Sequence, residues 1–99
     1  MLTLLAKKEV FEWLKMGQKT IDIRRGKPKQ SDKVLFISGP YKLEMRVVGV
    51  QSGRLYELIR KDNFKQIIPS ADSVDDAVIY LRRIYGGFDG LFTAYFVSC

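Results

Sequence analysis

The sequence predicts an α+β domain built on a small, closed or nearly closed β-sheet of about five strands with two to three helices. Several short segments alternate apolar and polar residues, which is typical of strands. Segments with helical spacing interrupt them without regular βαβ alternation, which favours a curled sheet over a parallel one. A length of 99 residues fits one domain. We therefore treat residues 1–99 as a single domain.

Near the N-terminus, residues 3–5 predict a short strand and residues 7–16 predict a helix. Three apolar side chains of this helix share one face: Val10, Phe11 and Leu14. Gly17 then predicts the end of the helix, because glycine readily adopts the positive φ found after many helices.

Residues 20–24 predict the next strand. Two isoleucines alternate there with polar side chains that include Asp22 and Arg24, so we expect a strand buried on one face only. Gly26 and Pro28 follow and predict a loop.

The middle of the chain continues the sheet. Residues 33–38 and 42–50 alternate in the same way and predict two strands joined by a Gly-Pro turn. Gly53 and Arg54 begin a predicted short helix, and residues 62–72 are expected to be irregular.

The last third predicts a helix and a central strand. Ser73 can cap the free amides of a helix that carries an apolar stripe and ends at Gly86. Residues 91–98 are largely apolar and predict a central strand. We expect one shared core that contains Val34, Phe36, Val47, Leu81, Phe92 and Phe96.

Residues 24–33 concentrate the positive charge of the chain. They hold five Lys or Arg residues against one Asp, and so supply four of the six net positive charges. Such a strip predicts contacts with phosphate, the alternative being a solvated loop. The predicted nucleic-acid-binding residues are Lys19, Arg24, Arg25, Lys27, Lys29 and Lys33. Three aromatic residues either stack bases or pack against the core: Tyr41, Tyr85 and Phe88.

The segment Gly17-Gln18-Lys19-Thr20, followed by a hydrophobic strand ending in Arg24, resembles the signature of ASCH domains, which are small PUA-like β-barrels associated with RNA. The order of the later predicted elements extends this resemblance over nearly the whole chain. The chain departs from the family at Ser31-Asp32, where many members have Gly-Asp. The resemblance implies a PUA-like barrel and an RNA-binding activity.

The resemblance also implies a ligand-facing lysine at the mouth of the barrel, and this role falls on Lys19. In members similar to acetylcytidine amidohydrolases, that lysine works with a Thr three residues on and an acid near the last helix. These positions are Asp22 and Ser70 here, with Asp72 the nearest carboxylate. The implied catalytic set is Lys19, Asp22 and Asp72, in which the lysine acts as a base or binds an oxyanion. Otherwise Lys19 and Asp22 form a surface pair of little energetic consequence.

These observations lead to three hypotheses of different classes. The first is a module that binds RNA, or single-stranded nucleic acid more generally, through the cations that follow Lys19. The second is a small hydrolase acting on modified nucleosides or RNA. The third is a protein-interaction module in a transcription or translation complex.

Other classes find no support in the composition. The chain has no His and only one Cys, at position 99, so it predicts no His-ligated metal site, no internal disulfide and no cofactor. Cysteine usage and the lack of a long apolar run predict a cytoplasmic protein without membrane contact, and we expect a monomer. The sequence around Lys19 is not a P-loop, because no Gly directly precedes the lysine and the helix precedes the strand.

Overall fold

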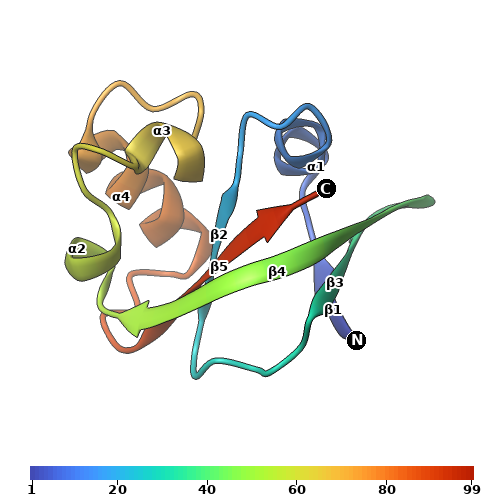
Figure 1. The fold of residues 1–99 in the computed structure, drawn as a ribbon. Helices are drawn as coiled ribbons and strands as arrows, with labels where there is room; N and C mark the ends of the chain where they lie inside the picture. Colours follow the sequence, from blue (N-terminus) through green and yellow to red (C-terminus); the bar gives the residue numbers. More distant parts are fainter.

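The computed structural model describes residues 1–99 and shows an α+β domain in which five strands form one sheet (Figure 1). The strands are β1 (Leu2–Leu5), β2 (Ile21–Arg25), β3 (Lys33–Ser38), β4 (Tyr41–Gly53) and β5 (Phe92–Ser98). The helices are α1 (Lys8–Lys15), α2 (Leu55–Leu58), α3 (Phe64–Ile67) and α4 (Val74–Ile84). The order in the sheet is β1-β3-β4-β5-β2, with β1 parallel to β3 and the other neighbours antiparallel.

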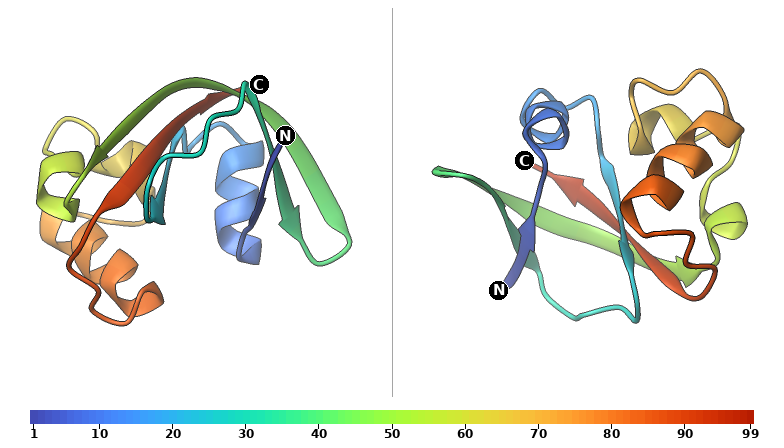
Figure 2. Two further views of the ribbon diagram at one scale, coloured as in Figure 1. Left: turned by 90° about the horizontal axis from the view of Figure 1, so that it is seen from below. Right: turned by 180° about the vertical axis from the view of Figure 1, so that it is seen from behind.

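The sheet is strongly curled and forms half of a barrel, as its arched profile in Figure 2 shows. Strands β1 and β2 are its two edges, and no backbone ladder joins them. Helix α1 lies under the arch, whereas α2, α3 and α4 gather at the other side (Figure 2). The prediction of an α+β domain with a curled sheet of about five strands is thus confirmed, and four helices are present, of which α1 and α4 are substantial.

Strand β5 lies inside the sheet and pairs with a strand on each side, as expected of a central strand, and its two faces contribute to two separate apolar clusters. Residues Phe92 and Ala94 pack with Leu81 in the cluster under α2, α3 and α4. Tyr95 and Val97 face the opposite side and belong to the cluster inside the arch. Side chains alternate across a strand, so a strand covered on both faces divides the apolar residues.

The prediction of one shared core is therefore wrong. Val34 and Phe36 belong to the cluster inside the arch, with Val47 packed against it. Leu81 and Phe92 belong to the other cluster, with Phe96 packed against that one.

Strand β2 also departs from its prediction, because both of its faces are covered. Ile21 and Ile23 pack in the cluster under the helices, as expected. Asp22 points the other way and is nevertheless only 3% exposed. The curl of the sheet brings β1 and α1 over this second face, which no local pattern in residues 20–24 could show.

The helix boundaries follow local signals. Gly17 has a φ of +78° just after α1, and the amide of Asp76 donates to Ser73 Oγ at 3.1 Å at the start of α4. The segment expected to be irregular contains the one-turn helix α3. No helix has the length and apolar character needed to cross a bilayer.

Candidate functional site

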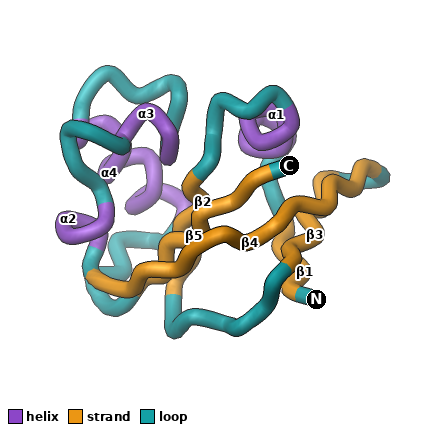
Figure 3. The backbone as a smooth tube through the Cα atoms, in the orientation of Figure 1, coloured by secondary structure: helices purple, strands orange, loops and turns teal.

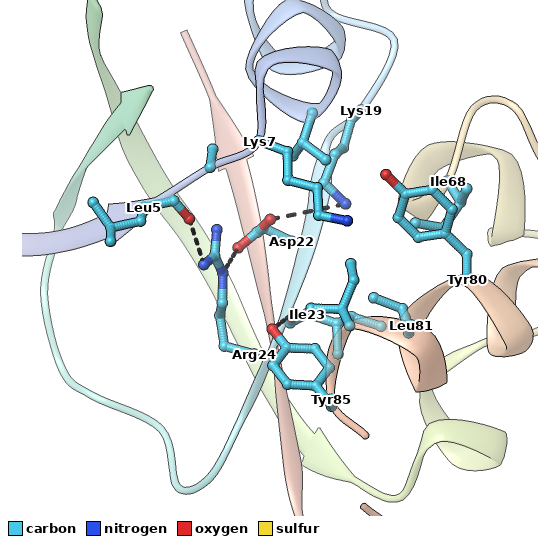
Figure 4. Close-up of a pocket in the computed structure, with 13 residues that line it drawn as sticks. Leu5, Lys7, Lys19, Asp22, Ile23, Arg24, Ile68, Tyr80, Leu81 and Tyr85 are labelled. Atoms are coloured by element: carbon cyan, nitrogen blue, oxygen red, sulfur yellow. Dashed lines mark hydrogen bonds and ion pairs between the residues drawn. The ribbon is translucent and has the colours of Figure 1, made fainter. Parts of the chain in front are cut away.

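A buried charged cluster lies at the free edge of β2 (Figure 4). The carboxylate of Asp22 accepts a hydrogen bond from Arg24 Nε at 2.6 Å, and its other oxygen lies 3.8 Å from Lys19 Nζ. Lys19 is only 2% exposed. The three side chains that the sequence placed on or near β2 therefore converge, and the alternative of an exposed surface pair is wrong.

The ammonium of Lys19 is held by oxygen atoms on several sides. It donates to the carbonyls of Ile21, at 2.9 Å, and Ile67, in addition to its ion pair with Asp22. Burial lowers the pKa of Lys19 from 10.5 to about 8, and the opposing charge of Asp22 limits this decrease. Burial also lowers the pKa of Arg24, but the charge and hydrogen bond of Asp22 outweigh it and raise that pKa above its ordinary value.

These bonds complete the outer edge of β2. Thr20 accepts from the Val97 amide on the β5 side, so the alternate residues Ile21 and Ile23 direct their carbonyls away from β5. Lys19 donates to the first of these carbonyls, and the Tyr85 hydroxyl donates to the second at 3.1 Å. Lys19 thus has a structural role in addition to any functional one.

A cavity of about 80 Å³ opens beside the cluster, between the start of α1, the edge of β2 and α4. Helices α1 and α4 are joined across it, because Tyr80 donates to Glu9 Oε1 at 3.0 Å and Lys7 Nζ lies 5.8 Å from the centre of the Tyr80 ring. In Figure 4, Tyr80 lies to the right of Lys7 and Lys19. Pockets for drug-sized ligands have volumes of about 300–1,000 Å³, so this cavity admits only a small group in its present shape.

The remaining predicted cations lie outside this cluster. Arg25, Lys27, Lys29 and Lys33 are exposed and flank or occupy the connection from β2 to β3, which runs along the lower edge of the molecule in Figure 3. Arg24 and Arg25 are separated because consecutive residues of a strand point to opposite faces. We call residues 25–33 the basic loop. The structure thus divides the predicted strip into a buried part and an exposed part.

Asp72 does not join the cluster. Its side chain is 92% exposed and lies 4.0 Å from Lys65, beside a different hollow next to α3 and the start of α4. Ser70, at the position of the implied acid, is also exposed. Of the implied catalytic set, Lys19 and Asp22 are therefore close together, whereas Asp72 lies elsewhere.

Comparison with solved structures identifies the fold. The crystal structure of hypothetical protein PH0355 matches with a TM-score of 0.79 and 20% identity over 98% of this chain and 96% of the other. The solution structure of protein PF0455 from Pyrococcus furiosus gives 0.69 and 19%, over 98% and 94%. The crystal structure of ASCH from Zymomonas mobilis gives 0.72 and 14%, over 98% and 66%. No family model and no curated protein sequence matches.

The fold of this chain is therefore ASCH-like. The resemblance noted in the sequence is confirmed at the level of the fold, since the match to the Zymomonas mobilis ASCH structure covers almost all of this chain.

Sequence reasoning missed two features of this region. It did not anticipate that Arg24 binds Asp22 and the Leu5 carbonyl of β1. The alternation of side chains along β2 already indicated that Arg24 and Arg25 point to opposite faces. It also did not pair Arg25 with Phe88, whose ring lies 4.1 Å from the guanidinium carbon. No local pattern links these two residues, because they are far apart in the chain.

Proposed function

We propose that this domain binds RNA through the basic loop. The proposal rests on a set of exposed cations that have no acidic partners. They lie on a segment whose backbone is hydrogen-bonded to the sheet. Arg25, Lys27 and Lys29 form no ion pair, whereas Lys33 lies 3.8 Å from Glu44. Uncompensated Lys and Arg side chains attract phosphate groups.

Hydrogen bonds from the sheet fix the course of the basic loop. Thr93 Oγ1 donates to the Gly26 carbonyl at 2.7 Å, and the Lys29 amide donates to the Tyr95 hydroxyl at 3.0 Å. Near the other end, the Asp32 carbonyl accepts from the Val47 amide at 2.8 Å. A loop ordered before binding loses less conformational entropy when a ligand docks, which favours affinity.

Lys19 and Arg24 are left out of the proposed contact set. Their charged groups already bind Asp22 and backbone carbonyls, and a phosphate would have to displace these partners. The proposal therefore narrows the predicted interface to Arg25, Lys27 and Lys29, with Lys33 at its margin.

Two triple variants with equal loss of charge test this proposal. The first carries Arg25→Gln, Lys27→Gln and Lys29→Gln. The second carries Lys15→Gln, Lys42→Gln and Lys61→Gln, three exposed lysines outside the basic loop that form no ion pair.

Binding of a fluorescent single-stranded RNA is measured by anisotropy. A hydrogen bond to a charged group contributes about 1.5–3 kcal/mol, so losing even one should raise Kd about tenfold in the first variant. The second variant should bind nearly as the wild type does. Equal weakening in both variants would mean that net charge, not the basic loop, attracts the RNA.

A hydrolase acting on modified nucleosides or RNA is the second candidate. Lys19, with a lowered pKa, lies beside Asp22 at a cavity, and perturbed groups in clefts often take part in catalysis. The small cavity and the distant Asp72 argue against it. Turnover of an acetylated cytidine or of RNA by the purified domain, abolished in a folded Lys19→Met variant, would favour this candidate over simple binding.

A further inference from the structure

An exposed arginine, Arg25, lies over the ring of Phe88. The guanidinium carbon of Arg25 lies 4.1 Å from the centre of the Phe88 ring. Phe88 meets the buried Phe92 ring edge-on, with centres 5.5 Å apart and an angle of 66° between the planes. Arg25 therefore lies over a ring that is anchored in the core, and Arg25 itself is exposed. We call Arg25 and Phe88 the stacking platform.

The turn between α4 and β5 is built to hold this ring in place. A Cβ atom at Gly90 would lie 2.3 Å from Phe88 Cζ, so any larger residue there would force the ring to move. The Gly26 amide donates to the Leu91 carbonyl at 2.8 Å and joins the end of β2 to the same turn. The platform thus depends on both segments, which lie together at the lower edge of the molecule in Figure 1.

Arg25 has no acidic partner, and this distinguishes it from Arg24 one position earlier. The guanidinium of Arg24 donates hydrogen bonds to Asp22 and to the Leu5 carbonyl. Arg25 forms no ion pair and contacts an aromatic face instead. A guanidinium is planar and charged, and it can stack on a planar group while an aromatic ring lies on its other side.

We propose that the outer face of Arg25 stacks an unpaired nucleobase while Lys27 and Lys29 hold the flanking phosphates. This inference rests on the RNA-binding function proposed above and names the class of ligand: single-stranded rather than duplex RNA. Bases in a duplex are already paired and stacked, whereas unpaired bases stack readily on aromatic rings and guanidinium planes. Every base has such a face, so the platform tolerates many sequences.

The test separates the plane of Arg25 from its charge. Arg25→Lys keeps the positive charge and removes the planar group, whereas Arg83→Lys makes the same change at an exposed arginine on α4 that forms no ion pair. Gly90→Ala leaves every charge in place and displaces Phe88. Circular dichroism and thermal unfolding check that each variant folds. The probe is a single-stranded oligouridine carrying one 2-aminopurine, whose fluorescence falls when the base stacks.

We expect wild type to quench the probe and to bind it more tightly than a blunt RNA duplex of equal length. Arg25→Lys should weaken binding about tenfold, within the range measured for loss of one stacked base. Gly90→Ala should weaken it in the same direction, and Arg83→Lys should leave it unchanged. If Arg25→Lys binds and quenches as wild type does, or if the duplex binds equally well, the stacking inference is wrong.

These outcomes differ from failure of the proposed function. Salt-dependent binding that requires the basic loop but is indifferent to Arg25→Lys would leave RNA binding in place and remove only the stacked base. Absence of RNA binding by the wild type, at low salt and high protein concentration, would overturn both proposals.

Discussion

Arg24 Nη1 on β2 donates a hydrogen bond to the Leu5 carbonyl at the end of β1, at a distance of 2.7 Å. The same guanidinium binds the buried Asp22 through Nε at 2.6 Å (Figure 4). A side chain therefore spans the two edge strands that have no backbone ladder between them. Arg24 therefore helps to hold the two edges of the half-barrel together.

Removing this guanidinium should destabilise the fold. Arg24→Met keeps an apolar stem but leaves Asp22 with only the more distant Lys19, 3.8 Å away. Breaking a buried ion pair on one side costs about 3–5 kcal/mol of unfolding free energy, which urea denaturation measures. Arg83→Met, at an exposed position, is the control. The double variant with Asp22→Asn should lose less than the two single losses combined, because the carboxylate that Arg24→Met leaves without its guanidinium is then absent as well. Strict additivity would argue against the coupling.

Stability should depend on pH through Lys19. The pKa of Lys19 is about 8 in the folded chain against an ordinary value of 10.5. Between these values the unfolded chain binds more protons than the folded one, so stability rises with pH across that window. Burial of the charged ammonium destabilises the folded chain in full below about pH 8, and this destabilisation is absent above about pH 10.5.

The Lys19→Met variant isolates this effect, because titration of all other groups is largely shared. The unfolding free energy of wild type relative to Lys19→Met should increase by about 3 kcal/mol from neutral pH to the top of the window. Urea denaturation at several pH values measures it. A difference that stays flat with pH would show that the folded pKa of Lys19 is not lowered.

The two apolar clusters should respond independently to mutation. Leu81 is 4% exposed, and Leu81→Ala should cost about 2–5 kcal/mol. Combined with Val34→Ala in the other cluster, the losses should add within about 0.5 kcal/mol. Leu81 and Val78 both lie on α4 in one cluster. When Leu81→Ala is combined with Val78→Ala, the loss of unfolding free energy should deviate more from the sum of the single losses. Strong coupling between Leu81 and Val34 would indicate one continuous core.

RNA binding should weaken with salt in proportion to the number of phosphate contacts. If all three cations contact phosphates, the logarithm of the association constant against that of salt concentration should have a slope of roughly −2 for a single strand. If Arg25 stacks on a base and only Lys27 and Lys29 contact phosphates, the slope should be roughly −1.4. Anisotropy titrations across a range of KCl concentrations measure the slope. The variant that lacks the charges of Arg25, Lys27 and Lys29 should show a slope near zero, and an unchanged slope would place the contacts elsewhere.

Local sequence signals predicted where helices and strands begin and end better than they predicted which of their faces are buried. Gly17, Ser73 and the alternation in β3 and β4 act within a few residues, and each holds in the structure. The burial of Asp22 depends on how far the sheet curls, which arises from packing among all five strands. The division into two clusters has the same origin, because β5 looks equally apolar whether one or both of its faces are covered.

The candidate site shows the same limit. Lys19 stood out by its position after the helix, but its bond to the Ile67 carbonyl joins segments far apart in the sequence. Arg25 and Phe88 likewise meet only because the chain returns after α4. The charge of the basic loop was readable from composition alone, since exposure of a Gly- and Pro-containing loop needs no tertiary information.

The bonds that Lys19 and Tyr85 make to β2 also bear on aggregation. An open sheet edge offers unpaired carbonyls that can recruit a strand from another molecule. Here the outward carbonyls of Ile21 and Ile23 are occupied by the protein's own side chains, and that of Leu5 on the opposite edge is occupied by Arg24. A half-barrel with two edges can in this way resist strand exchange between copies, so substitutions at these three donors should promote self-association as well as unfolding.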